Sequence, residues 1–571
     1  MTQNSFKNLI PIGFLSCVLI FFFTFQLGNR PFATPDEGRY VEIPREMVAT
    51  GDYLTPRLNG IKYFEKPPLF YWLQASNIKM FGIQEGPMRL WVAFFALIGC
   101  LATYAFGKTN FDRTTGIFSA FVLGSSVLYF SLSRLIILDM PVSILVTLIL
   151  YSFYQGFEAE SGTKRRLWFY CFSISCALGV LTKGIMALAI PGPIIVIWLT
   201  VTGGWKRVLP VYLPTSLFLF LLIAAPWHIL VSLKNPEFAY KYFIVEHFMR
   251  YTTDVHLRYK PIWFFIPILI AGFLPWTAFI PASIVDAWKN RTSSLNSYLL
   301  IWAGWVFAFF SVSNSKLIPY ILPMFPALAL LIGKYLSDIW TNKNPKNKTT
   351  LYIYNSVFCI ALCLLGGGIA LYFPELLEEK ADLLPYIHSL MAIFFISGLL
   401  TFLYIKRTDS PISFESLAGS VFVRIFNLRT SQIIISIVCA SSVAILITLI
   451  NAAPYMQRPS IKPLAEIIQA QKQLGDKVVS FMAYYQDLPV YTRQTVTVVE
   501  AKGELEFGTT VEDTSSWMIK EEQFLKLWHE KQRVWGIGRK AELDRFQKLY
   551  PKFKYKIIAN DSGNILFTQI S

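Results

Sequence analysis

Residues 432–450 read QIIISIVCASSVAILITLI and contain no charged side chain. A helix of this length rises about 28 Å, which is close to the roughly 30 Å of hydrocarbon in a bilayer. The stretch therefore predicts a helix that crosses a membrane.

Similar apolar runs recur along the whole chain, and hydropathy predicts about thirteen of them. They lie near 10–28, 90–107, 115–132, 136–155, 167–181, 185–202, 209–232, 262–283, 297–312, 316–338, 351–372, 385–405 and 432–450. The composition agrees, because 54% of the 571 residues are hydrophobic and only 15% are charged, against about 25% charged in soluble domains. We predict an α-helical polytopic membrane protein, which excludes soluble, secreted and disordered classes.

The loops between these runs carry the net charge of +16 in an alternating pattern. Lys and Arg cluster in every second loop, which places those loops in the cytoplasm and accounts for the charge without nucleic acid. The pattern predicts a cytoplasmic N-terminus and a C-terminus outside. All seven cysteines lie in apolar runs, so neither a disulfide framework nor a cysteine metal site is indicated.

The same topology divides the chain into two domains. Residues 1–453 form a transmembrane domain with long outer loops at 29–89 and 233–261. Residues 454–571 lose the apolar runs and alternate β-rich stretches such as 477–481 with polar helical segments. We predict a small α/β domain on the outer face for this tail.

The first outer loop contains Thr34-Pro35-Asp36-Glu37-Gly38-Arg39-Tyr40. Thr34 and Glu37 have the spacing of a capping box, which is a structural role. Asp36 does not occupy the reciprocal position of that box, and the start of a helix would keep it ionised. Asp36 is therefore the functional candidate of this stretch.

The same loop continues with Tyr63-Phe64-Glu65-Lys66-Pro67-Pro68. Lys66 could place a positive charge on a phosphate near the following helix. The alternative is that Glu65 and Lys66 form a solvated ion pair in the loop.

Ionisable residues also stand where other spans reach the outer surface. Asp139 and Lys183 are two of them, and an ionisable group at a membrane boundary suggests a functional role by default. The alternative for Asp139 is an ion pair with Arg134. The alternative for Lys183 is a side chain that only extends to the interface. The second outer loop has Glu246-His247-Phe248-Met249-Arg250-Tyr251, and Lys316 begins a later span. Residues from five distant parts of the chain thus converge on one interface.

Several of these motifs, in this order, resemble one family. The chain resembles the bacterial aminoarabinose transferases that modify lipid A, within the wider protein-O-mannosyltransferase-like GT-C superfamily. The resemblance is strongest over residues 30–330. It rests on Asp36-Glu37 with Arg39-Tyr40, Tyr63-Phe64-Glu65-Lys66-Pro67, Leu138-Asp139-Met140, Leu181-Thr182-Lys183-Gly184, Glu246-His247-Phe248 with Arg250-Tyr251, Leu274-Pro275-Trp276, and Ser315-Lys316-Leu317 with Tyr320-Ile321-Leu322-Pro323.

This resemblance implies an inverting glycosyltransferase in the bacterial inner membrane. Its donor would be a sugar, aminoarabinose or a similar aminosugar, on undecaprenyl phosphate, and its acceptor a lipid A phosphate on the periplasmic face. The predicted catalytic residues are Asp36, Asp139 and Glu65. The residues expected at the donor phosphate are Lys66, Arg250, Tyr320 and Lys183, and the other pocket candidates are Arg39, Tyr40 and Lys316.

The sequence establishes no cofactor. Glu65 and His247 could bind a divalent metal ion, Zn²⁺ or Mg²⁺, but two ligands are fewer than such a site needs, and a lone histidine is more often only hydrogen-bonded.

Two other functions fit the same motifs. The first keeps the fold and the lipid-linked donor but transfers the sugar to a protein Ser or Thr or to another glycan. The second is a carrier or flippase for a lipid-linked solute, which should place charged or broken helices at mid-membrane.

Overall fold

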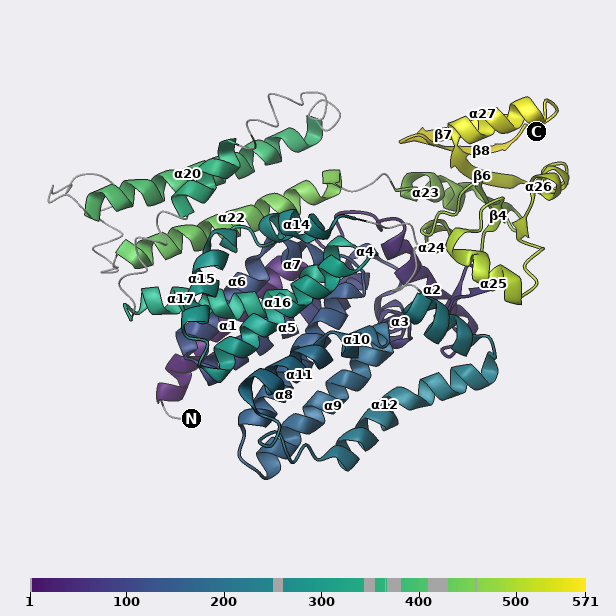
Figure 1. The fold of residues 1–571 in the computed structure, drawn as a ribbon. Helices are drawn as coiled ribbons and strands as arrows, with labels where there is room; N and C mark the ends of the chain where they lie inside the picture. The colour runs from purple at the N-terminus through teal and green to yellow at the C-terminus, as the bar shows by residue number, and fades with distance from the viewer. Residues whose placement is uncertain are drawn as a thin grey trace.

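The structure is a computed structural model that describes residues 3–249, 260–343, 355–364, 366, 381–408, 430–456 and 460–570. It is mostly helical, with a sheet domain at the C-terminal end (Figure 1). The predicted fold class, an α-helical polytopic membrane protein with a C-terminal α/β domain, is confirmed. The number of thirteen spans is not.

Seven helices of the described residues are long and apolar enough to cross a membrane, or eight if one bent pair counts as a span. The pair is 262–272 with 276–289, and its axes differ by 112°. The helices of this part are α1 (Gln3–Thr24), α5 (Leu90–Asn110), α6 (Arg113–Ser125), α7 (Val127–Leu132), α8 (Asp139–Glu158), α9 (Thr163–Lys183), α10 (Met186–Ala189), α11 (Pro191–Thr202), α12 (Leu213–Lys234), η1 (Tyr240–Met249), η2 (Ile262–Phe264), α14 (Phe265–Gly272), η3 (Trp276–Phe279), α15 (Ile280–Lys289), α16 (Ser294–Val312), η4 (Ile318–Met324), α17 (Phe325–Trp340), η5 (Ala381–Leu383), α20 (Leu384–Thr408) and α22 (Thr430–Met456).

Helix α8 forms the centre of the membrane part. Of its apolar window, 94% is buried inside the protein, whereas for α12 the value is only 22%. Such an all-round buried helix needs apolar or small residues on every face, and α8 supplies them in Pro141-Val142-Ser143-Ile144-Leu145-Val146. Helix α8 packs against α9, α5 and η4, so its first residue, Asp139, lies among several helix ends.

The first outer loop folds into α2 (Asp36–Thr50), the short hairpin of β1 (Arg57–Leu58) and β2 (Ile61–Lys62), α3 (Leu69–Phe81) and α4 (Glu85–Met88). Helix α2 has Asp36 and Glu37 in its first turn, where carboxylates favour the positive end of the helix. It ends at Gly51, whose φ of 73° allows the left-handed C-cap.

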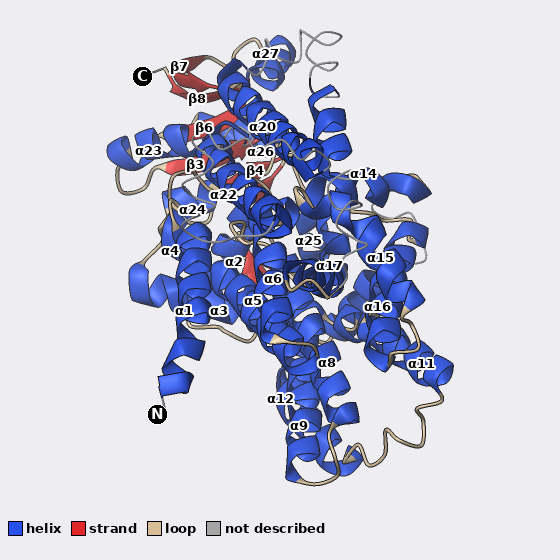
Figure 2. Ribbon diagram, turned by 90° about the vertical axis from the view of Figure 1, so that its left-hand side faces the viewer, coloured by secondary structure: helices blue, strands red, loops and turns tan. Residues whose placement is uncertain are grey.

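The C-terminal domain is a six-stranded sheet between two layers of helices (Figure 2). The strands are β3 (Lys477–Phe481), β4 (Thr497–Val499), β5 (Met518–Ile519), β6 (Val534–Arg539), β7 (Tyr555–Asp561) and β8 (Asn564–Gln569), in the order β5-β4-β3-β6-β8-β7. In this order, the four strands β5, β4, β3 and β6 pair in parallel, whereas β8 pairs antiparallel with both β6 and β7. The helices are α23 (Lys462–Gln471), α24 (Leu488–Thr492), η6 (Gly503–Leu505), α25 (Glu506–Val511), α26 (Glu521–Trp528) and α27 (Lys540–Leu549).

Alternation along β3 distributes its side chains to the two faces of this sheet. Val478 packs with Leu464 and Ile468 of α23, while Val479 packs on the opposite side with Phe524 of α26. This is the period-two pattern of a strand buried on both faces. The β-rich stretch predicted at 477–481 is confirmed, whereas the domain boundary at 453/454 stays a prediction.

The C-terminal domain rests on the first outer loop (Figure 1). Arg57 forms an ion pair with Glu512, with Nη2 and Oε1 2.9 Å apart. The Asn59 side chain donates to the Val496 carbonyl at 3.0 Å and accepts from the Val496 N–H at 2.9 Å. These bonds fasten the β1–β2 hairpin to the domain.

Candidate functional site

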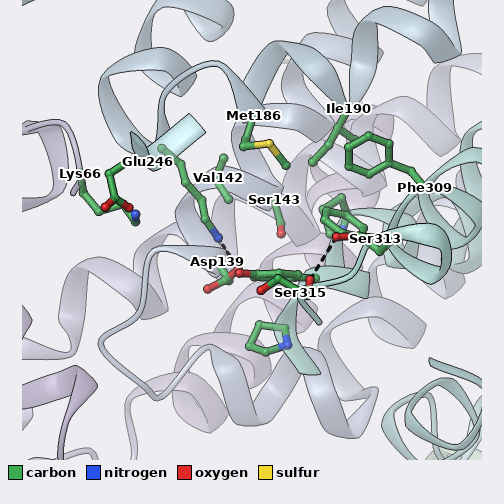
Figure 3. Close-up of a pocket in the computed structure, with 15 residues that line it drawn as sticks. Lys66, Asp139, Val142, Ser143, Met186, Ile190, Glu246, Phe309, Ser313 and Ser315 are labelled. Atoms are coloured by element: carbon green, nitrogen blue, oxygen red, sulfur yellow. Dashed lines mark hydrogen bonds and ion pairs between the residues drawn. The ribbon is translucent and has the colours of Figure 1, made fainter. Parts of the chain in front are cut away.

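A pocket opens where the start of α8, the end of α9 and η4 meet (Figure 3). Its volume is about 870 Å³, including space open to solvent. The polar residues of its wall are Lys66, Asp139, Ser143, Lys183, Glu246, Ser313, Ser315 and Tyr320. Four of the residues predicted from sequence, Lys66, Asp139, Lys183 and Tyr320, thus line one pocket.

Asp139 and Lys183 form an ion pair inside this pocket. The Lys183 Nζ lies 2.6 Å from the Asp139 Oδ1, and the two side chains are only 18% and 16% exposed. Asp139 is the first residue of α8 and Lys183 the last of α9, so each charge also stands at the favourable end of its helix dipole. The Lys183 Nζ lies 5.0 Å from the centre of the Tyr320 ring, within cation–π range. Asp139 therefore pairs with Lys183 and not with Arg134.

Arg134 instead anchors the end of α1. Its guanidinium donates to the carbonyl oxygens of Phe22 at 2.8 Å and Phe25 at 2.7 Å. Those carbonyls belong to the last turn of the helix and its continuation, where no intrahelical donor is available. The Arg134–Asp139 alternative drawn from sequence is accordingly not what the structure contains.

Lys66 lines the pocket next to Glu246 (Figure 3). The Lys66 Nζ donates to the Glu65 carbonyl oxygen at 2.8 Å. Glu246 is nearly buried and forms an ion pair with Lys241 at 3.0 Å. Glu246 was not among the predicted site residues, although it directly precedes His247 in the motif of the second outer loop.

One wall of the pocket is apolar. It consists of Val142, Met186, Ile190, Phe309, Phe310, Pro319 and Pro323. Cationic groups beside such a wall suit a ligand that has an anionic head and a hydrocarbon chain.

Asp36 is not part of the wall of this pocket. Its side chain is 57% exposed, and its Oδ1 lies 3.6 Å from the Arg39 Nη1. Burial raises the pKa of the Tyr40 hydroxyl well above its usual value. The carboxylates of Asp36, Asp139 and Glu65 add to this rise and Arg39 opposes it. Because such effects fade with distance, Tyr40 is near both the Asp36–Arg39 pair and Asp139 of the pocket.

The predicted capping box of Thr34 and Glu37 is wrong. Helix α2 begins at Asp36 with Pro35 as its N-cap, and no side chain caps it. The Glu37 carboxylate turns inward and accepts from Arg89 at 2.7 and 2.8 Å and from Arg30 at 3.2 Å. Burial alone would raise the pKa of Glu37, but the two guanidinium groups lower it to about 2.

Arg30 and Arg89 were missed in the sequence analysis. Both lie close to the ends of apolar runs, where a basic residue is usually interpreted as setting the orientation of the span in the membrane. Their partner is a single carboxylate in the loop between those runs, which no local pattern indicates.

Three predicted residues need separate accounts. Lys316 is buried but does not line the pocket, because its Nζ donates to the carbonyl oxygens of Lys260 at 2.9 Å and Ser313 at 2.5 Å. Burial lowers the pKa of Lys316. Arg250 and the side chain of His247 lie outside the described residues.

The predicted metal pair of Glu65 and His247 stays a prediction for that reason. Within the described part of the chain, no group of three or more His, Cys, Asp or Glu side chains is placed to hold a metal ion.

Two protein-family models match separate parts of the chain. Residues 32–242 match the family "Dolichyl-phosphate-mannose-protein mannosyltransferase", and residues 464–569 match "Aminoarabinose transferase C-terminal domain".

Individual relatives carry a consistent name. The undecaprenyl phosphate-alpha-4-amino-4-deoxy-L-arabinose arabinosyl transferase of Serratia proteamaculans is 26% identical over 560 residues, which are 96% of this chain and 95% of that protein. Arabinosyl transferase 2 of Sodalis glossinidius is 34% identical over 331 residues, which span only 58% of this chain and 60% of that relative.

A solved structure matches almost the whole chain. The crystal structure of ArnT from Cupriavidus metallidurans bound to undecaprenyl phosphate superposes with a TM-score of 0.79 and 26% sequence identity, covering 98% of each chain.

The buried helical core, the loop of residues 29–89 with its acidic and cationic residues, and the C-terminal α/β domain define a polytopic membrane protein of the GT-C glycosyltransferase class. Both family matches and the full-length structural match then narrow the class. Over almost its whole length the chain is similar to the bacterial aminoarabinose transferases.

Proposed function

We propose that this protein is an inverting glycosyltransferase that moves 4-amino-4-deoxy-L-arabinose from undecaprenyl phosphate to a phosphate of lipid A. The names of the relatives and the undecaprenyl phosphate in the Cupriavidus crystal structure support the donor. The lipid A acceptor follows from the family resemblance of the motifs.

The proposed location is the bacterial inner membrane, with a cytoplasmic N-terminus and a periplasmic C-terminus. The alternation of basic loops supports this orientation. Residues 1–453 would then form the catalytic membrane domain, and 454–571 the periplasmic domain that rests on its first outer loop.

The observation that carries the proposal is the composition of the pocket. Lys66 and Lys183 reach the same space as the apolar side chains of Met186, Ile190 and Phe309. A polyprenyl phosphate needs both features, because its phosphate is anionic and its chain is hydrocarbon.

In the proposed step, an oxygen of the lipid A phosphate attacks the anomeric carbon of the sugar. The bond from that carbon to the donor phosphate oxygen breaks, and its electron pair leaves with undecaprenyl phosphate, so the configuration inverts. Negative charge develops on the leaving phosphate, and cations placed there stabilise the transition state. We assign this role to Lys66, with Arg250 as the second cation predicted from sequence.

Asp139 and Lys183 act as a unit in this proposal. The 2.6 Å ion pair fixes the Lys183 ammonium above the Tyr320 ring. Since Asp139 offsets much of the charge of Lys183, the pair would orient the donor phosphate more than it would neutralise it.

The carboxylates of Asp36 and Glu65 have a different proposed role. An acceptor phosphate is already ionised, so it needs little help from a general base. The two carboxylates would instead hold the ammonium of the aminosugar or orient the acceptor.

A match of residues 32–242 to a protein mannosyltransferase family favours one alternative, transfer to a protein hydroxyl. A hydroxyl must lose its proton as it attacks, so Asp36 would then act as the base.

Mass spectrometry of lipid A from cells with and without the gene tests the proposal. We expect lipid A from cells with the gene to carry the added mass of one aminopentose, and this species to disappear in the deletion. Unchanged lipid A together with the loss of a sugar from a membrane protein would favour the protein acceptor. Unchanged lipid A and unchanged proteins would contradict both transferase proposals.

A further inference from the structure

Glu504 of the C-terminal domain reaches the Asp36–Arg39 pair at the edge of the pocket. It lies in η6, and its side chain is only 16% exposed. The Glu504 Oε2 lies 2.7 Å from the Arg39 Nε, and the Oε1 accepts a hydrogen bond from the Gln486 Nε2 at 2.6 Å. The Tyr63 hydroxyl lies 3.5 Å from the same Oε2. The carboxylate is thus held on both oxygens.

A backbone contact fixes the distance between Glu504 and its partner. Gly38 precedes Arg39 and packs directly on the C-terminal domain, where a Cβ on residue 38 would lie 2.7 Å from the Asp487 backbone nitrogen and 2.8 Å from the Gln486 carbonyl carbon. No side chain fits into such a space. The first turn of α2 is therefore seated on the segment that also holds Glu504 through Gln486.

Two carboxylates, those of Glu504 and Asp36, lie close to the Arg39 guanidinium. Its Nε lies 2.7 Å from the Glu504 Oε2 in an ion pair that lacks hydrogen-bond geometry, and its Nη1 lies 3.6 Å from Asp36, beyond the length of a good charge-assisted hydrogen bond. A guanidinium prefers to bind one carboxylate with two parallel hydrogen bonds. Without the Glu504 charge, Arg39 could turn and form that two-bond pair with Asp36.

We infer that Glu504 is a positioning residue for sugar transfer, which holds Arg39 away from full pairing with Asp36 and so makes the C-terminal domain part of the active site. This inference rests on the proposed function for its kinetic consequence, while its structural consequence can be measured without any transfer reaction.

Charged and titratable groups from several elements surround Glu504. They are Arg39 and Asp36 of α2, Tyr63 and Glu65 of the loop before α3, and Tyr71 of α3. Burial raises the pKa of Glu504, the Arg39 charge opposes the rise, and the Glu65 and Asp36 carboxylates add to it.

The test replaces Glu504 with glutamine in the full-length protein, with a matched control in the same interface. Glu512 also joins the C-terminal domain to the first outer loop by an ion pair, to Arg57, but that pair lies apart from Asp36. Glu504→Gln is expected to lower kcat at least tenfold while the KM for the undecaprenyl-phosphate-linked donor changes less than twofold. Glu512→Gln is expected to keep kcat within twofold of the wild type.

An independent readout is the labelling of Asp36 by a water-soluble carbodiimide, followed by peptide mass spectrometry. The reagent attacks exposed carboxyl groups, and a tighter Arg39–Asp36 pair would cover the Asp36 carboxyl group, which is 57% exposed in the structure. We expect labelling of Asp36 to be at least threefold slower in Glu504→Gln than in the wild type or Glu512→Gln. If the wild type transfers no sugar, the proposed function fails, and the labelling still decides the role of Glu504.

Three results would overturn the inference. They are an Asp36 labelling rate unchanged by Glu504→Gln, an equal loss of kcat in Glu512→Gln, and an increase in KM with kcat preserved. Gln486→Met serves as a second variant if Glu504→Gln does not fold, because it removes the hydrogen bond to Glu504 while keeping the carboxylate. It should shift both readouts in the same direction by a smaller factor.

Discussion

Single cations in the pocket face different surroundings, and this difference decides their roles. Lys183 is tied to Asp139 at 2.6 Å, whereas Lys66 is held by the carbonyl oxygen of Glu65. Pairing with Asp139 suits Lys183 to orienting the donor phosphate. The proposal therefore assigns stabilisation of the leaving phosphate to Lys66.

Lys66→Ala is expected to lower kcat by roughly 100- to 1000-fold, since removing one preorganised donor from a developing anion costs about 2.7–4 kcal/mol in other enzymes. The measurement is transfer from the lipid-linked donor by purified protein. Lys79→Ala is the control, because Lys79 is exposed near the end of α3, the helix that follows Lys66, and lies over the Tyr53 ring. Retention of more than half the activity in Lys66→Ala would remove Lys66 from the mechanism.

The sequence predicted pocket residues correctly where they stand at the end of a membrane-spanning segment. Asp139, Lys183 and Tyr320 stand at the ends of apolar runs, so the shared outer boundary brings them together. It failed for Glu37, because the capping box is a local pattern and the actual partner, Arg89, is 52 residues away. The contribution of Glu504 was equally invisible, since it depends on how one domain rests on another.

Helix α2 is held through three consecutive residues that point to three different partners. Glu37 faces the guanidinium groups of Arg30 and Arg89, Gly38 touches the 486–487 backbone, and Arg39 meets Glu504. Successive residues of a helix point about 100° apart, so three neighbours can engage separate surroundings. The position of Asp36 thus depends on the membrane part and the C-terminal domain together.

Asp487 makes this joint sensitive to pH. Its side chain is fully buried at the start of α24, with Oδ2 accepting from Ser460 at 3.2 Å, and among the described residues Oδ1 has no hydrogen-bond partner. Burial raises the pKa of Asp487 from 3.8 to about 6. The folded state therefore binds more protons than the unfolded state between about pH 4 and 6, and stability falls as pH rises through this window.

Asp487→Asn should accordingly stabilise the protein at pH 7.5, by up to about 3 kcal/mol from a shift of this size. At pH 4 the aspartate is protonated in the folded state and about half protonated in the unfolded state, so most of the difference should be lost. Thermal unfolding of the purified protein and the variant at both pH values provides the measurement. An equal gain at pH 7.5 and pH 4, or a loss at pH 7.5, would show that Asp487 does not carry a buried charge.

At the scale of the whole molecule, hydropathy located the apolar segments but not their breaks. The predicted spans 115–132 and 185–202 are each two helices, and 262–283 bends by 112°. Hydropathy averages over a window, so it does not register an extended residue such as Ser126 between α6 and α7. The basic first turn of α9 likewise keeps that helix outside the limits for a span.

Breaks and helix ends are also what create the pocket. Helix α8 begins and helix α9 ends beside α10 and η4. The ionisable residues Asp139 and Lys183 at these two helix ends therefore meet apolar residues from the neighbouring segments. The motifs predicted several residues of the pocket. The depth of the pocket and its apolar wall could not be predicted, because they depend on how several helices pack together.

The central claim is that this pocket binds the lipid-linked donor by its phosphate. Electron cryomicroscopy of the protein in lipid nanodiscs with undecaprenyl phosphate tests it most directly. We predict phosphate density within hydrogen-bonding distance of the Lys66 Nζ, with the lipid chain along Met186 and Ile190. Phosphate density elsewhere, for example in the second hollow beside Lys462 and Arg493, with the Lys66 pocket empty, would contradict the account.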